Sequence, residues 1–123
     1  MNLIEEDKKI INSFKYAFEG IISALKTERN MKLHIFAMGI VILLGILLKI
    51  SKIEWCICFI SIAIVISAEL FNTAIETIVD MICIEKNEKA KLAKDVSAGA
   101  VLVLAIGALA VGIIIFLPKF IIN

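Results

Sequence analysis

The sequence is poor in the residues that most globular proteins use on their surfaces and in their turns. Only 20% of its 123 residues are charged, and it contains a single proline. Basic residues number 13 and acidic residues 12, so no excess of positive charge favours nucleic acid as a partner. Hydrophobic residues make up 61% of the chain, well above the roughly 45–50% of soluble domains. We therefore predict one integral membrane domain over residues 1–123.

Sequence motifs that often mark metal and nucleotide sites are also absent. Cys56 and Cys58 would lie about 200° apart around a helix, and Cys83 is near the far end of the same segment, so the three cannot share a metal. None of the six glycines precedes a lysine, which excludes a GxxxxGK phosphate loop. The HRD and DFG signatures of soluble protein kinases are missing as well. A nucleotide site in this chain must be built from separate side chains on helices.

Three apolar segments are long enough to cross a bilayer. They cover residues 33–50, 55–81 and 98–117. A helix needs about 20 apolar residues to cross the hydrocarbon core of a bilayer, which is about 30 Å thick. Helix is the expected conformation, because backbone polar groups in lipid must be paired within the protein. Residues 85–97 are polar, and we predict a short water-exposed helix there.

The segment before the first span has a different pattern. Over residues 6–26 apolar side chains recur at three- and four-residue spacing, and most charged side chains lie on other faces. This pattern predicts an amphipathic helix on the membrane surface, and a soluble amphipathic helix is the alternative. Lysine and arginine concentrate in the N-terminal region and between the second and third spans, which places both in the cytoplasm.

Small residues repeat along the third span. Ala98, Ala105 and Gly112 are seven residues apart, and Ala108 lies on the same side. Small side chains let helices approach closely in lipid, so we expect helix packing at these positions. Because three short helices cannot shield several carboxylates alone, we also expect a homo-oligomer.

A polar stripe runs along the second span. On a helix, five residues fall within roughly 60° of one direction: Glu69, Asn72, Thr73, Glu76 and Asp80. A charge inside a span costs at least ~2.5 kcal/mol, so its presence indicates function.

Depth separates the roles of the stripe. Counting ~1.5 Å per residue from Trp55 at the outer interface places Glu69 about 21 Å deep, still in hydrocarbon, and Glu76 at the cytoplasmic interface. A carboxylate away from water is a stronger base, which suits Glu69 for taking a proton from a lipid hydroxyl. Carboxylates at the interface can bind Mg²⁺, and Glu28, at the elbow before the first span, should lie level with Glu76. Asn72 lies one turn from both glutamates and could orient the acceptor.

Other polar residues belong to the same cytoplasmic side. Lys94 offers a positive charge to phosphate oxygens, and Asp95 could bind Lys94 or a second polar group. His34, near the cytoplasmic start of the first span, is either an interfacial anchor or a substrate contact.

These residues match a known pattern. Residues 69–80 read ELFNTAIETIVD, residues 93–95 read AKD and residues 98–102 read AGAVL. Together with the length and the three spans, they resemble the small prokaryotic diacylglycerol kinase family. Residues 28–30 (ERN), the following His34 and residues 115–119 (IFLPK) are similar to Gram-positive members, many of which are undecaprenol kinases.

The resemblance implies an all-α homotrimer of the bacterial plasma membrane that phosphorylates a lipid alcohol with ATP and Mg²⁺. The expected substrate is undecaprenol, with diacylglycerol as the alternative. The family carries an arginine in the surface helix, for which only Lys8 or Lys9 is available here. The implied site consists of catalytic Glu69 and Asn72, the metal and ATP ligands Glu28 and Glu76, the ATP contacts Lys94, Asp95, Tyr16 and Glu85, and substrate contacts at Glu69, His34 and Asn30.

A second functional class is a small proton-coupled transporter, because carboxylates within spans also mark proton relays. A transporter needs a polar path to the outer side. Between Trp55 and Val65, however, Ser61 is the only residue with a hydroxyl group.

Overall fold

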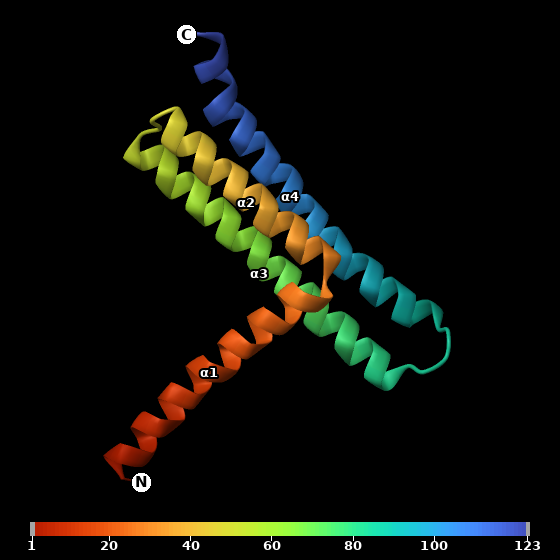
Figure 1. Ribbon diagram of the computed structural model, residues 1–123. Coiled ribbons are helices and arrows are strands. Elements are labelled where there is room, and N and C mark those ends of the chain that lie inside the picture. Colours follow the sequence, from red (N-terminus) through yellow and green to blue (C-terminus); the bar gives the residue numbers. More distant parts are fainter. Residues whose placement is uncertain (1, 123) are drawn as a thin grey trace.

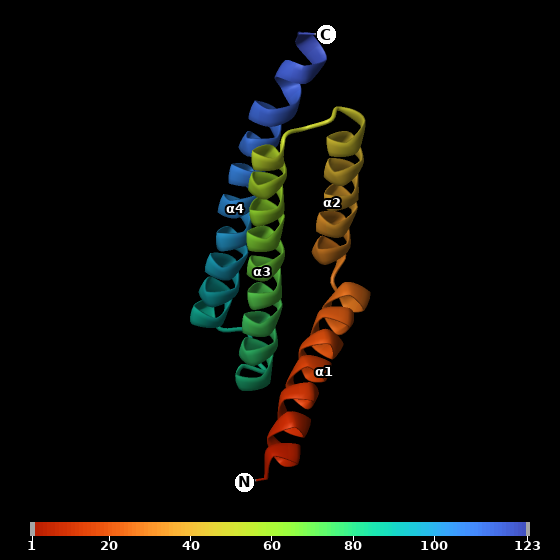
Figure 2. The ribbon, with the colours of Figure 1, turned by 90° about the vertical axis from the view of Figure 1, so that its left-hand side faces the viewer.

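A computed structural model describes residues 2–122, and these form four helices: α1 (Leu3–Thr27), α2 (Arg29–Leu47), α3 (Lys52–Ile82) and α4 (Glu88–Ile121). The prediction of an all-helical protein is confirmed, and the last three helices are long and apolar enough to cross a membrane. α2, α3 and α4 run side by side, whereas α1 leaves the bundle and ends far from it (Figures 1 and 2).

The first span ends at Leu47 rather than at residue 50 because a hydrogen-bonded cap stops the helix. Lys49 adopts a left-handed backbone with a φ of 51°. The Ile50 N–H donates to the Gly45 carbonyl (3.2 Å) and the Lys49 N–H to the Ile46 carbonyl (3.4 Å). This is the bonding of a Schellman motif, which hydropathy does not reveal because it depends on backbone conformation.

The polar segment and the third span form one helix, not the two separate segments that the sequence predicted. The Asn87 side chain accepts from the backbone N–H groups of Lys89 and Ala90 and starts α4 there. No helix-breaking residue follows until Pro118, so the helix continues while the polarity of its side chains changes. Pro118 itself lies inside the last turns of α4, so the helix runs past residue 117, where the predicted span ended.

α3 and α4 form the main packed pair, and α2 lies against α3. A small core of Ile50, Cys58, Ile115 and Phe116 lies at the end of the bundle where α2 passes into α3. Most other large apolar side chains are exposed on the chain. Such an extensive apolar surface is unusual for a soluble protein and suits contact with lipid or with other membrane helices.

The start of α3 and the end of α4 are tied together at this same end of the bundle. Ser51 and Glu54 form a capping box, in which the Ser51 side chain accepts from the Glu54 N–H and Glu54 accepts from the Ser51 N–H. The same Glu54 carboxylate accepts from Lys119 Nζ at 3.2 Å. One acidic side chain therefore caps α3 and holds α4 against it.

Gly45 provides a test of the packing between α2 and α3. A Cβ at this position would lie 2.6 Å from Cη2 and 2.8 Å from Cζ2 of Trp55, whose ring stacks on Phe59. Gly45→Ala should therefore lower the free energy of unfolding by about 1–3 kcal/mol, the usual cost of overpacking. Thermal unfolding in detergent micelles, followed by circular dichroism, measures the change.

Gly39 is the matched control, since it lies exposed on the same helix and its added Cβ would meet nothing within 4 Å. Gly39→Ala should leave the stability unchanged or slightly higher, because alanine favours helix. Equal destabilisation by both substitutions would contradict the close contact between Gly45 and Trp55.

Candidate active site

The polar stripe of α3 passes from the inside of the protein to its surface. Glu69 is 1% exposed and Asn72 is 5% exposed, Glu76 is half-buried, and Asp80 is exposed. The burial of these side chains follows the order in which depth counting placed them. Their environments therefore differ, and so does the chemistry available to each.

Glu69 lacks the partners that a buried carboxylate needs. Its Oε2 lies 3.6 Å from His34 Nε2, which is too long for a hydrogen bond. Among residues 2–122, neither carboxylate oxygen of Glu69 has a hydrogen-bond donor, and the buried Oδ1 of Asn72 also has none. An unsatisfied buried polar group costs about 1–3 kcal/mol, and more when it is charged, so Glu69 is not there for stability.

The neighbouring hydroxyl and amide groups are satisfied within α3. Thr73 donates to the Glu69 carbonyl at 3.0 Å, and Asn72 Nδ2 donates to Glu76 Oε1 at 3.4 Å. The second bond fixes the amide of Asn72 between the two glutamates. Its unpaired oxygen then remains available, like the oxygens of Glu69, for a donor from outside the chain.

Glu28 approaches this cluster from another part of the chain. It is the single non-helical residue between α1 and α2, with an extended backbone (φ −99°, ψ 116°), as the predicted elbow requires. Both Glu28 and Glu76 lie close enough to Glu69 to act on its charge. Three acidic side chains from two segments therefore face one region.

The acidic side chains suit one mode of metal binding. Within residues 2–122 no group of three or more His, Cys, Asp or Glu side chains is arranged to hold a metal by itself. Mg²⁺ seldom uses such a cage and is usually held by one or two carboxylates together with substrate phosphates and water. Glu28 and Glu76 fit this second mode.

A polar hollow of about 580 Å³ lies at the end of the bundle where α3 passes into α4. Glu85 and Lys94, two predicted ATP contacts, both line it, as does Asp80. Lys94 Nζ lies 2.5 Å from Asp80 Oδ1, so Lys94 forms an ion pair with the last residue of the polar stripe. Asp95, for which Lys94 was one of the predicted partners, does not form this pair.

The other predicted contacts lie on exposed surfaces. Asp95 pairs with Lys91 at 2.6 Å, one turn earlier on α4. Asn30 is exposed in the first turn of α2, and Tyr16 is exposed on α1. The structure thus groups Glu69, Asn72, Glu76 and Glu28 at one place and Lys94 and Glu85 at a second.

Comparison with known proteins decides the family of the chain. The model of the prokaryotic diacylglycerol kinase family matches residues 15–116. The chain belongs to the prokaryotic diacylglycerol kinase family. An undecaprenol kinase of Bacillus subtilis (strain 168) is 44% identical over 114 residues, which cover 93% of each chain.

Two further relatives are named diacylglycerol kinases. The protein of Synechocystis sp. is 39% identical over 110 residues, 89% of this chain and 63% of the relative. That of Haemophilus influenzae is 37% identical over 94 residues, 76% of this chain and 80% of the relative. This diacylglycerol kinase family member is therefore a lipid kinase with several membrane spans, and the transporter alternative is rejected.

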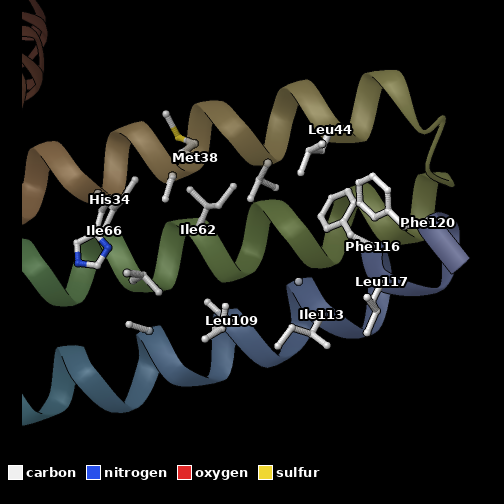
Figure 3. A pocket seen from close by; sticks show the side chains of 16 residues that line it. His34, Met38, Leu44, Ile62, Ile66, Leu109, Ile113, Phe116, Leu117 and Phe120 are labelled. Carbon is white, nitrogen blue, oxygen red and sulfur yellow. The ribbon is translucent and has the colours of Figure 1, made fainter.

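From the sequence of this family member, His34 could be either an anchor at the membrane interface or a substrate contact. The structure places its imidazole next to Glu69 and at one end of an apolar groove between α2, α3 and α4 (Figure 3). No spacing rule predicts this approach, because residues 34 and 69 lie on different helices.

The environment of Glu69 generates a stability prediction. Glu69→Met removes a buried carboxylate without partners, and the free energy of unfolding should rise by about 1–3 kcal/mol. Glu54→Met is the matched control: it removes both the helix cap and the ion pair to Lys119, so it should lower stability by about 1 kcal/mol. Chemical denaturation in detergent compares the variants, and a loss of stability in Glu69→Met would mean that Glu69 has a structural partner.

Proposed function

We propose that the protein transfers the γ-phosphate of ATP to the hydroxyl of undecaprenol and forms undecaprenyl phosphate. The observation that carries the proposal is the buried Glu69 carboxylate without a hydrogen-bond donor, on the same helix as the more exposed Glu76. The name and the 44% identity of the Bacillus subtilis relative support undecaprenol as the acceptor.

In the proposed reaction, Glu69 is the general base. The lipid hydroxyl gives its proton to the Glu69 carboxylate as its oxygen bonds to the γ-phosphorus. The bond from this phosphorus to the bridging oxygen breaks, and ADP leaves with the electron pair. Burial favours this role, because a carboxylate shielded from water binds a proton more readily. Asn72 and His34 would orient the hydroxyl, and Asn30 would contact the substrate near the start of α2.

We assign Glu28 and Glu76 to Mg²⁺ and to the nucleotide. A bound Mg²⁺ would neutralise charge on the phosphate oxygens. Lys94 and Glu85 line the polar hollow and would contact ATP, joined by Asp95 and Tyr16. To bind a phosphate, Lys94 must exchange its pairing with Asp80, which costs little because both side chains are partly exposed.

We further propose that three copies assemble in the bacterial plasma membrane with their N-termini in the cytoplasm. The apolar side chains of α1, such as Ile11, Phe14 and Phe18, are exposed on the chain, which suits a helix lying on the membrane surface. α1, which carries Tyr16, leaves the bundle (Figures 1 and 2), so a site that includes Tyr16 is more readily completed by α1 of a neighbouring copy.

Diacylglycerol is the second candidate acceptor, since the relatives in Synechocystis and Haemophilus influenzae are named for it. Purified protein should be assayed with radiolabelled ATP against both alcohols in mixed micelles. We expect kcat/KM for undecaprenol to exceed that for diacylglycerol by about tenfold or more, as for substrates told apart by the shape of an apolar site. A preference for diacylglycerol would reverse the assignment of the lipid.

Glu69→Gln tests the proposed base. It should reduce kcat by at least about 100-fold, the lower range for loss of a general base, while binding of MgATP remains as in the parent. Glu19→Gln, an exposed change on α1, is the matched control and should retain full activity. Retained turnover in Glu69→Gln would exclude Glu69 as the base.

Glu28→Gln and Glu76→Gln test the proposed metal ligands. Either variant should raise the Kd for ATP in the presence of Mg²⁺ by roughly 10-fold or more, because a charge-assisted contact is lost. The Kd measured without Mg²⁺ should change less. Isothermal titration calorimetry at several Mg²⁺ concentrations gives both values, and unchanged MgATP affinity in both variants would remove these residues from the metal site.

A further inference from the structure

An apolar groove of about 490 Å³ lies between α2, α3 and α4, and small residues form part of its α4 wall. Ala105, Ala108 and Gly112 line it from α4. A Cβ at Gly112 would meet nothing within 4 Å, so Gly112 itself is not in close contact with another helix of the chain. Within the chain, Gly112 thus borders open space, and Ala105 and Ala108 line the same groove.

The groove ends beside the buried carboxylate. His34 is the one residue with a charged or hydrogen-bonding side chain among those that line it, and its Nε2 lies 3.6 Å from Glu69 Oε2. Glu69 is 1% exposed, and both of its oxygens lack a donor among the described residues. An apolar groove thus leads to a buried acceptor that needs a donor.

The opposite end of the groove is lined by aromatic side chains. Phe116 and Phe120 lie near Leu44 there, far from His34 (Figure 3). At 1.5 Å per residue, the lining extends about 15 Å along α2, from His34 to Leu44, and about 22 Å along α4, from Ala105 to Phe120. The groove therefore follows much of the ~30 Å hydrocarbon core, and its volume lies in the range of about 300–1,000 Å³ found for ligand sites.

We propose that this groove binds the hydrocarbon chain of a single-chain lipid alcohol, with the hydroxyl past His34 at Glu69 and the chain along Ala105, Ala108 and Gly112. The inference rests on the proposed lipid kinase reaction and adds the site that holds the chain of the acceptor. A prenol has the matching arrangement, with one hydroxyl donor at the end of one apolar chain. The small side chains leave room for its methyl branches.

Filling the groove tests the proposal. Gly112→Leu places a large side chain about 10 Å along α4 from Ala105, beyond the reach of a short prenol but in the path of a long one. We expect the ratio of kcat/KM for undecaprenol to kcat/KM for geraniol to fall by about tenfold or more. The new leucine would displace part of the long chain of undecaprenol from the groove, whereas the short chain of geraniol would keep its contacts. The KM for ATP should not change.

Gly107→Leu is the matched control, because Gly107 lies exposed on the same helix, does not line the groove and has nothing within 4 Å of an added Cβ. It should leave the ratio as in the parent. Ala108→Leu, with exposed Ala110→Leu as its control, repeats the test in case Gly112→Leu does not fold. If the groove variants and their controls gave the same ratio, the proposal would be overturned.

Two readouts separate the possible causes of failure. A prenol carrying a photoreactive group on its chain should label residues 105–120 in the parent and much less in Gly112→Leu. If the groove instead holds a helix of a second copy, Gly112→Leu would change the oligomeric state in light scattering, and labelling would be absent, which overturns the proposal. Should the parent phosphorylate no lipid alcohol while the prenol still labels the groove, the proposed reaction fails and the binding site stands.

Discussion

The absence of water from the bilayer core governs this structure. Backbone groups that cannot bond to solvent must bond to each other, which forces the apolar segments into helices. The same condition makes every polar side chain in a span costly unless it has a partner. Thr73 and Thr77 meet this condition by donating to carbonyls one turn earlier in α3. Glu69 does not meet it, and the exception identifies the centre of the site.

Much of the fold could be predicted because lipid leaves few choices. The three spans and the elbow at Glu28 follow from hydropathy and from the change in pattern before the first span. The ends of the helices could not be predicted in the same way. The cap around Lys49 depends on backbone hydrogen bonds, and the continuity of α4 through Ser97 depends on conformation, whereas hydropathy records only solvent preference. A polar segment and an apolar segment can share one helix.

In the site, too, the arrangement of residues on one helix could be predicted, whereas contacts between different helices could not. Glu69, Asn72 and Glu76 share a face because they share a helix, so their spacing was enough to group them. The contacts of Lys94 with Asp80 and of His34 with Glu69 join different helices. Their partners are fixed by how the helices cross, which one sequence does not specify. Among the small residues of α4, spacing identified the shared face but could not say whether a helix or a cavity lies opposite it.

Ion pairs at both ends of α3 have a mechanical consequence. Asp80 with Lys94 at one end and Glu54 with Lys119 at the other link α3 and α4 into one frame. α2 is joined to α3 by the approach of His34 to Glu69 at 3.6 Å, and to the rest of the chain by the bends at Glu28 and Lys49. Because α2 supplies both His34 and one wall of the groove, any displacement of α2 against this frame would change the width of the groove and the separation of His34 from Glu69 together. Room for an apolar chain and the position of the proton acceptor therefore depend on the same helix.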